Sequence, residues 1–307
     1  MWQFGLLERP DARNQRDPLT VTHKADAMFK DDLLQGKKVL ITGGGTGLGA
    51  AMGRRFVELG AQLVICGRRV EVLADAVAQL HDEFHAQVAT ISCDISDPEA
   101  VESMMAAIWA AGPLDILVNN AAASFIARTE TLSAHALGAV LGVTLHGALY
   151  CTLAAGRRWI GDGRSGVVLS ILSTSTRTGR AFTVPSAIAK SGLLAMTRSL
   201  AVEWGPKGVR LVAIAPGPFP TAGASANLNP MQRQKTYGSN TMNPLGRNGE
   251  PVELANLAAY LVSDFAGYIN GEMVAIDGGQ HLRTSGADDL LGWSGEQWAQ
   301  LRKTRER

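Results

Sequence analysis

The stretch TGGGTGLG, residues 42–49, follows the apolar run VLIT (39–42) and precedes a segment of helical periodicity that begins AAMGRRF. Gly43, Gly47 and Gly49 are spaced so that the chain can turn tightly, approach a pyrophosphate and pack the helix near the strand. The first N–H groups of that helix would face the anion. The stretch therefore predicts a dinucleotide site, with a glycine-rich turn that binds nothing as the alternative. We expect its contacts to come from Gly43, Gly44, Thr46, Gly47, Leu48 and Gly49.

The alternation of apolar runs and helical patterns continues outward from this turn. We expect strands near residues 39–42, 63–66, 88–91, 115–118, 167–171, 210–214 and 273–276. We expect helices near residues 47–59, 70–80, 98–110, 133–160, 184–204 and 251–263. Apolar strands that are each followed by a helix indicate a parallel sheet covered on both faces. The sequence thus predicts one α/β domain, residues 36–280, with a doubly wound Rossmann sheet of about seven strands.

Composition indicates a globular protein with a small-molecule substrate. The chain has 307 residues, of which 46% are hydrophobic and 19% charged, and a formal net charge of +1. This balance gives no electrostatic reason to expect nucleic acid or an anionic membrane as a partner. The three cysteines show neither a disulfide framework nor metal-ligand spacing, so we expect no metal and a reducing compartment.

The ends of the chain read as extensions, residues 1–35 and 281–307. Residues 1–35 lack a signal-type apolar core and are too acidic for a transit peptide. The longest apolar stretch, residues 137–153, contains several glycines and His146, which argues against a membrane span. We therefore expect a cytoplasmic protein.

The end of the second expected strand carries Gly67, Arg68 and Arg69. A site that prefers NAD would place an acidic residue there, against the ribose hydroxyls. A guanidinium can instead pair with a 2′-phosphate and stack on the adenine. The arginines predict NADP(H) as cofactor, the alternative being two solvated side chains at the start of a helix.

These features resemble the short-chain dehydrogenase/reductase family, from about Gly36 to Gly279. The glycine turn looks like the family's Thr-Gly-x-x-x-Gly-x-Gly loop, and the segments CDI (93–95), NNAA (119–122), PGP (216–218) and DGG (277–279) match further family motifs in order. The resemblance implies cofactor contacts from Asp94, Ile95, Asn120, Ala121, Lys190, Pro216, Gly217 and Phe219.

Within that family the chain is most similar to the 2,4-dienoyl-CoA reductases. They share NNAA, a PSAxAK stretch like residues 185–190, and a helix similar to SLAVEWGPKGVR (199–210). The resemblance implies NADPH, a fatty enoyl-CoA as substrate and hydride delivery to a conjugated double bond. The helices near 133–160 and 184–204 form the subunit contact in this family, which implies a homotetramer or a dimer.

The serine at position 186 decides the expected chemistry. The wider family carries a tyrosine, ordinary pKa about 10, four residues before the lysine that matches Lys190. A serine hydroxyl is a far poorer acid than a phenol, but it can donate a hydrogen bond to a thioester oxygen on which negative charge develops. Dienoyl-CoA reductases also have serine there, so Ser186 fits that subfamily. Ser173 matches the family's active-site serine.

Three further positions depart from the dienoyl-CoA reductases. Ser175 stands where the mitochondrial-type enzymes have a proton-donating tyrosine, Ser124 where they have an asparagine, and His146 where an asparagine usually anchors a water. Water, His146 or a serine hydroxyl could relay the proton, and histidine has the ordinary pKa nearest neutrality. A histidine on such a helix is more often a packed or water-bonded residue, and the altered site could have lost reductase chemistry.

The irregular stretch 216–250 is long enough to be a substrate loop or lid. Met231 and Tyr237 could line an acyl slot, with packing against the body as the alternative. Arg180, Arg233, Lys235 and Arg247 could meet CoA phosphates, although a solvated surface charge is the more common role of such residues. Two other functions remain open: a carbonyl reductase or alcohol dehydrogenase for a bulky or cyclic substrate, and an NADP-binding homologue without turnover.

Overall fold

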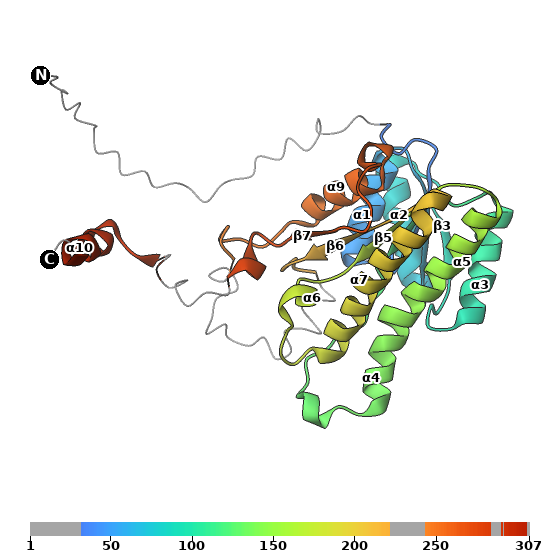
Figure 1. Ribbon diagram of the computed structural model, residues 1–307. Helices are drawn as coiled ribbons and strands as arrows, with labels where there is room; N and C mark the ends of the chain where they lie inside the picture. Colours follow the sequence, from blue (N-terminus) through green and yellow to red (C-terminus); the bar gives the residue numbers. More distant parts are fainter. Residues whose placement is uncertain (1–31, 222–242, 284–289, 291, 306–307) are drawn as a thin grey trace, which may run out of the picture. The chain divides into compact units, whose positions relative to one another are not determined.

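The computed structural model describes residues 32–221, 243–283, 290 and 292–305 (Figure 1). The chain divides into Met1–Lys30, which lies outside the described residues, and Asp31–Arg307, which holds the fold. The expected N-terminal extension therefore falls almost wholly outside the described residues. Its last part does not: Leu34 is buried, and its N–H donates to the carbonyl of Leu59 at 2.9 Å.

A seven-stranded sheet in the order β3-β2-β1-β4-β5-β6-β7 forms the centre of this unit (Figure 1). All six strand pairs are parallel. The strands are β1 (Lys38–Thr42), β2 (Gln62–Gly67), β3 (Ala89–Ser92), β4 (Ile116–Asn119), β5 (Gly166–Ile171), β6 (Val209–Pro216) and β7 (Met273–Ile276). The prediction of a doubly wound Rossmann fold is confirmed, because the strand order reverses between β1 and β4.

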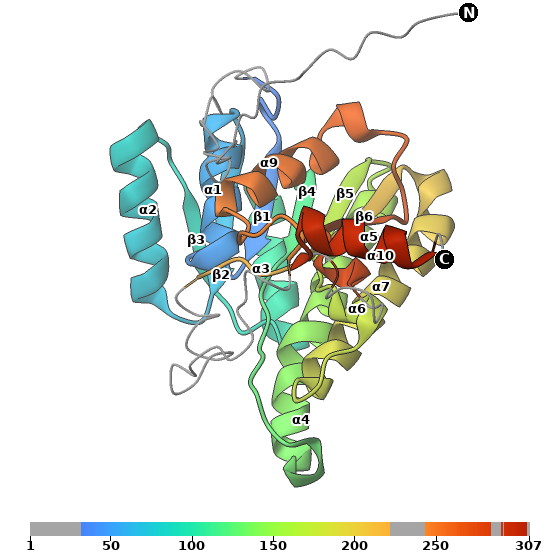
Figure 2. The same ribbon diagram turned by 90° about the vertical axis from the view of Figure 1, so that its left-hand side faces the viewer.

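Helices cover both faces of the sheet (Figures 1 and 2). The α-helices are α1 (Gly47–Glu58), α2 (Val70–Phe84), α3 (Pro98–Ala110), α4 (Ala134–Leu141), α5 (Ala148–Gly161), α6 (Ser175–Thr178), α7 (Val184–Trp204), α9 (Pro251–Val262) and α10 (Gly295–Arg305). The 3₁₀ or π segments are η2 (Thr129–Thr131), η3 (Gly142–Gly147), η4 (Gly205–Lys207), η6 (Asp264–Ala266) and η7 (Gln280–Leu282). On one face α1 packs against α2 and α9, and on the other α5 packs against α3 and α7.

The core under α3, α5 and α7 is built around Trp159. Its side chain is fully buried, and its indole N–H donates to the carbonyl of Leu114 at 2.6 Å. Gly166 at the start of β5 has no side chain, and a Cβ there would overlap the indole ring. The large ring therefore fills the space that a glycine leaves at the sheet, while its polar atom is satisfied.

The helix expected near residues 133–160 is three segments, because the π turn η3 separates α4 from α5. A Cβ at Gly147, the last residue of η3, would lie 2.6 Å from Ile95 Cγ1, so a glycine lets this helix approach the segment after β3. The run Ala134–Gly161, whose most apolar 18 residues have a mean hydropathy of 1.6, is long and apolar enough to cross a membrane by length and composition. One such helix is weak evidence for a span, since buried helices of globular proteins pass the same test.

Candidate functional site

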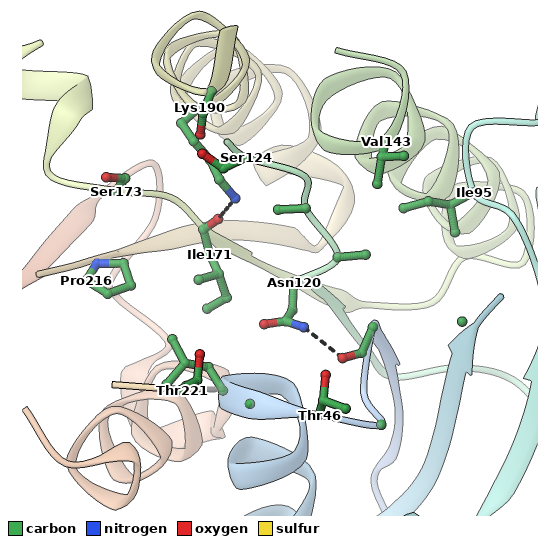
Figure 3. A pocket seen from close by; sticks show the side chains of 18 of the residues that line it. Thr46, Ile95, Asn120, Ser124, Val143, Ile171, Ser173, Lys190, Pro216 and Thr221 are labelled. Carbon is green, nitrogen blue, oxygen red and sulfur yellow. Dashed lines mark hydrogen bonds between the residues drawn. The ribbon is translucent and has the colours of Figure 1, made fainter. Parts of the chain in front are cut away.

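A cleft of about 490 Å³ opens at the carboxyl ends of the strands (Figure 3). Its walls come from the β1–α1 turn, the ends of β2, β4 and β5, the segment after β3, the start of α7 and the segment after β6. The cleft spans the point between β1 and β4 where the strand order reverses, which is where open α/β sheets bind ligands.

Most of the predicted site residues line this cleft. They are Gly43, Thr46, Gly47, Leu48, Arg68, Arg69, Asp94, Ile95, Asn120, Ala121, Ser124, Ser173, Ser175, Arg180, Ser186, Lys190, Pro216, Gly217 and Phe219. Gly44, Gly49 and His146 are not among the lining residues. Val143, Leu172, Thr183 and Thr221 also line the cleft and were not singled out from the sequence.

The glycine turn is shaped by close backbone contacts. A Cβ at Gly49 would overlap the carbonyl oxygen of Gly43, and one at Gly44 would lie 2.5 Å from Ile65 Cγ2 on β2. These two glycines therefore allow the turn to close, as expected for Gly49, and neither lines the cleft. Their contact with a cofactor stays a prediction. Gly47 has φ +56°, and Thr46 precedes α1 without a capping side-chain hydrogen bond. The first N–H groups of α1 are thus left to an anionic ligand.

Thr42 joins the glycine turn to the segment after β4. Its hydroxyl oxygen accepts the N–H groups of Asn120 and Ala121, each at 3.0 Å. The Asn120 side-chain amide donates back to the carbonyls of Thr42 at 2.9 Å and Gly43 at 3.1 Å. The amide group of Asn120, predicted to contact the cofactor, therefore braces the turn. Sequence reasoning missed the role of Thr42, whose signal was a polar residue at the end of an apolar strand.

The end of the cleft near β2 and β3 carries opposite charges. Arg68 is 69% exposed, and its guanidinium lies 3.9 Å from the Asp94 carboxylate. Hydrogen bonds from the Ser96 hydroxyl and backbone lower the pKa of Asp94. Burial raises the pKa of the Cys66 thiol to about 12, and it raises that of Cys93, so both thiols beside the cleft are neutral.

Lys190 and the serines form the other end of the cleft. The Lys190 side chain is buried beneath it, and its ammonium group donates to the carbonyl of Ile171 at the end of β5 (Figure 3). Burial lowers the pKa of Lys190 to about 8. The Ser173 hydroxyl oxygen accepts the N–H of Ser175 at 3.3 Å, and Ser186 lies one turn before Lys190 on α7. Lys190 and serine hydroxyls thus face one space.

His146 lies apart from the cleft. Its side chain is exposed on η3, and its ring centroid is 6.3 Å from that of Tyr150. The buried residues of this turn are Thr144 and Gly147. The Thr144 hydroxyl oxygen accepts the N–H of Ala123 at 3.0 Å, and the hydroxyl donates to the Ala123 carbonyl at 3.3 Å. Thr144 therefore holds the segment that leads to Ser124. The π turn shifts which side chains face inward, so regular helical spacing could not identify it.

The predicted substrate loop is described only at its two ends, residues 216–221 and 243–250. Met231, Arg233, Lys235 and Tyr237 lie outside the described residues. Arg247 forms two hydrogen bonds, of 2.6 and 2.8 Å, with the Glu253 carboxylate on α9, and they raise the pKa of Arg247. Its guanidinium therefore braces the start of α9, whereas Arg180 is exposed and lines the cleft.

Comparison with known proteins gives consistent matches over most of the chain. A family model described as enoyl-(acyl carrier protein) reductase matches residues 43–281. A Bacillus subtilis protein named a probable 2,4-dienoyl-CoA reductase is 42% identical over 251 residues, which cover 81% of this chain and 98% of that protein.

Solved structures agree with these matches. A short chain dehydrogenase from Bacillus anthracis is 40% identical with a TM-score of 0.73, covering 81% of this chain and 98% of that one. A putative 2-deoxy-D-gluconate 3-dehydrogenase from Agrobacterium tumefaciens, solved with bound NADP, is 30% identical with a TM-score of 0.75, covering 83% and 100%.

Proposed function

Because the chain belongs to the short-chain dehydrogenase/reductase family, we propose that it uses NADPH to reduce a conjugated C=C bond of an enoyl-CoA. The resemblance inferred from the motifs is confirmed at the level of this family. One observation carries the proposal: Lys190 and serine hydroxyls share the cleft, and none of its described lining residues is a tyrosine. Such a site can stabilise negative charge that develops on a substrate oxygen. The reaction we propose does not require a tyrosine as acid next to that oxygen.

The shape and charge of the cleft fit a dinucleotide phosphate. The glycine turn, closed by the approach of Gly49 to Gly43, would receive the pyrophosphate at the start of α1. Arg68 would pair with the 2′-phosphate, and Lys190 would hold the nicotinamide ribose. When bound, NADPH supplies the hydride.

The serines stabilise the charge that hydride addition creates. Negative charge develops on the thioester oxygen, and the hydroxyls of Ser186 and Ser173 donate hydrogen bonds to it. The Lys190 ammonium, with a pKa of about 8, is mostly protonated near neutrality and adds a buried positive charge below them. Loss of one such donor costs on the order of 3 kcal/mol, roughly a hundredfold in rate.

The proton that completes the reaction needs a separate source. His146 is exposed and does not line the cleft, so it is not the acid we assign. Ser175 is buried at the cleft and occupies the position of the tyrosine in the mitochondrial-type enzymes. We assign the proton to water that enters the cleft and is held by the serine hydroxyls.

A substrate panel tests the proposal directly. The protein is mixed with NADPH and 2,4-dienoyl-CoA, 2-enoyl-CoA, bulky ketones or cyclic ketones, and NADPH consumption is followed. We expect turnover with the dienoyl-CoA substrates. Turnover of ketones alone would identify a carbonyl reductase, and tight NADPH binding without turnover on any substrate would identify a non-catalytic homologue; either result overturns the proposal.

Cofactor choice is tested in the same assay with Arg68→Gln and, as the matched comparison, Arg69→Gln. A charge-assisted hydrogen bond to a phosphate contributes about 1.5–3 kcal/mol, so Arg68→Gln should raise the KM for NADPH roughly 10- to 100-fold. The KM for NADH, which lacks the 2′-phosphate, should stay within about twofold. A larger effect of Arg69→Gln would assign the phosphate to Arg69 instead.

A further inference from the structure

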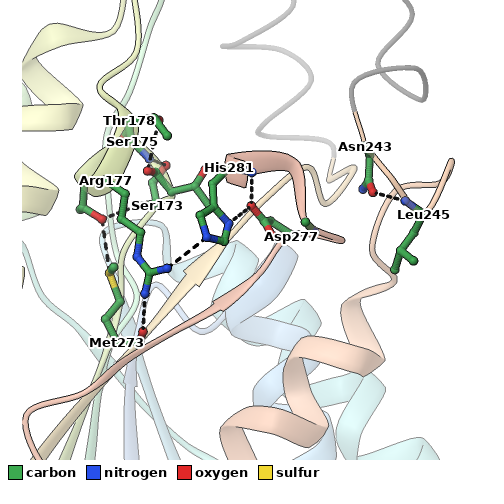
Figure 4. A network of polar contacts seen from close by, with 12 residues as sticks. Ser173, Ser175, Arg177, Thr178, Asn243, Leu245, Met273, Asp277 and His281 are labelled. Carbon is green, nitrogen blue, oxygen red and sulfur yellow. Dashed lines mark hydrogen bonds and ion pairs between the residues drawn. The ribbon is translucent and has the colours of Figure 1, made fainter. Parts of the chain in front are cut away.

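A chain of polar contacts links the end of β7 to the serine end of the cleft (Figure 4). Asp277 is buried, and one of its carboxylate oxygens accepts both the backbone N–H of His281 at 2.8 Å and the ring Nδ1 at 2.7 Å. The other ring nitrogen, Nε2, lies 3.0 Å from a guanidinium nitrogen of Arg177. Arg177 also donates to the carbonyl of Met273 on β7 at 3.4 Å.

The direction of each hydrogen bond follows from the chemistry of the end groups. A guanidinium can only donate, so Nε2 of His281 must be the unprotonated, accepting nitrogen. A carboxylate can only accept, so Nδ1 must carry the proton. The contacts therefore require a neutral imidazole with its proton on Nδ1. His281 then donates to the Asp277 carboxylate and accepts from the Arg177 guanidinium.

Arg177 belongs to α6, the single helical turn that begins at Ser175, two residues after Ser173. The N–H of Thr176 donates to the Ser173 carbonyl at 3.1 Å, and the Thr176 hydroxyl donates to it at 2.9 Å. The same hydroxyl lies 3.3 Å from the sulfur of Met273. One turn of helix is not stable alone, so α6 depends on its contacts with α7, with β7 and with the turn after β7.

At its Asp277 end, the same chain of contacts reaches Pro216, the last residue of β6, and Gly217 beside the cleft. A Cβ at Gly217 would lie 2.5 Å from Cβ of Asp277, and the Gly217 N–H donates to the Ile276 carbonyl at 2.9 Å. Pro216 and Gly217 line the cleft, as do Ser173 and Ser175. Asp277 therefore packs on one wall, while Arg177 anchors the other.

We propose that His281 is a positioning residue: its neutral ring holds Arg177 and thereby fixes α6, and with it the hydroxyls of Ser173 and Ser175, relative to the Pro216–Gly217 wall of the cleft. His281 itself touches no substrate. The expected effect of His281 on the reduction rate rests on the proposed function. Its effect on how firmly α6 is held in place does not.

The test compares His281→Ala, His281→Gln, Arg177→Met and the double variant His281→Ala/Arg177→Met. Glutamine offers an N–H toward Asp277 and a carbonyl toward Arg177, so it keeps the donor–acceptor pattern that alanine removes. Thr178→Ala is the matched control, because among the described residues the Thr178 hydroxyl bonds to the Thr174 and Gly179 carbonyls of the same turn and to no other group.

We expect His281→Ala and Arg177→Met each to lower kcat with dienoyl-CoA about tenfold, since small displacements of catalytic groups cost rate. The KM, the Kd for NADPH and the Tm should change little. The double variant should be no slower than either single variant, because both break the same link. His281→Gln and Thr178→Ala should resemble the wild type.

Two measurements need no turnover. Hydrogen exchange in a peptide covering residues 173–181 should be faster in His281→Ala and Arg177→Met, and unchanged in His281→Gln and Thr178→Ala. Long-range ¹H–¹⁵N spectra should show the His281 ring protonated on Nδ1, with the signal assigned by its loss in His281→Gln.

The outcomes separate the two proposals. An Nε2-protonated ring, unchanged exchange in His281→Ala, or equal behaviour of the alanine and glutamine variants would overturn the role of His281. If the wild type turns over no dienoyl-CoA, the proposed function fails, and the exchange and tautomer measurements still decide the role of His281.

Discussion

Lys190 shows how a single residue can serve the site at a cost to stability. Its ammonium group is buried and donates to one backbone carbonyl, and burial lowers its pKa from 10.5 to about 8. No carboxylate pairs with it in the hydrogen bonds and ion pairs of the described residues. A buried charge with so little compensation is expected where function requires it.

Replacement of this lysine should therefore stabilise the fold while it abolishes activity. At pH 7 the wild type carries the buried charge, and Lys190→Met should gain up to about 3 kcal/mol in free energy of unfolding. Between pH 8 and 10.5 the unfolded chain binds more protons at this lysine than the folded chain, so wild-type stability should rise with pH. Urea unfolding at several pH values measures both effects; an advantage of the variant that grew over this window would contradict the assignment.

At the scale of elements, the π turn η3 decides what the long helix presents to the cleft. It turns the Thr144 hydroxyl onto both backbone groups of Ala123 and leaves His146 exposed. The segment after β4 is irregular, so its partly buried backbone groups depend on side chains such as Thr144 for hydrogen bonds. A small change in helical register thus supports one wall of the cleft.

Thr144→Val tests this support, because valine keeps the shape and removes the hydroxyl. The N–H of Ala123 would lose its partner, and we expect a loss of about 1–3 kcal/mol in free energy of unfolding. Thr197→Val is the control: Thr197 is also fully buried, but its hydroxyl donates only to the Leu193 carbonyl within α7. It should cost less than about 1 kcal/mol in the same urea titration, and equal losses would argue against a special role for Thr144.

At the scale of the whole molecule, the exposed apolar side chains of α7 are relevant to the assembly of subunits. Val202 on α7 is 80% exposed and Ile188 is 49% exposed, so this helix carries apolar side chains beyond those that cover the sheet. We propose that the protein is a homo-oligomer that buries this face, and we retain the cytoplasmic location as a prediction for cell fractionation.

Light scattering after gel filtration tests the assembly. We expect a mass of two or four chains for the wild type and a smaller one for Val202→Glu, because a buried unpaired carboxylate opposes association. Glu203→Gln is the neighbouring control and should leave the mass unchanged. A monomeric wild type would refute the assembly proposal without affecting the proposed chemistry.

Local patterns along the chain were sufficient to predict the fold class, the seven strands and the position of the glycine turn, because backbone propensity and apolar periodicity act over a few residues. Arg68 could also be placed at the cleft, since the carboxyl ends of parallel strands meet at one edge of the sheet. Lys190, on α7, could be placed there only through the family resemblance. Long-range partners could not be predicted in this way. Neither the pairing of Arg247 with Glu253 nor that of Arg177 with His281 has a signal in local spacing.

The sequence by itself thus predicted the sheet and the region of the cleft, which depend on short-range rules, and its motifs indicated the family by resemblance. Only the tertiary structure decided that Thr144 and not His146 faces inward, that the Asn120 amide braces the glycine turn, and that Asp277 and His281 reach α6. The physical reason is that a hydrogen bond between distant segments depends on how helices and turns pack on the sheet, and packing is set by the whole core rather than by neighbouring residues.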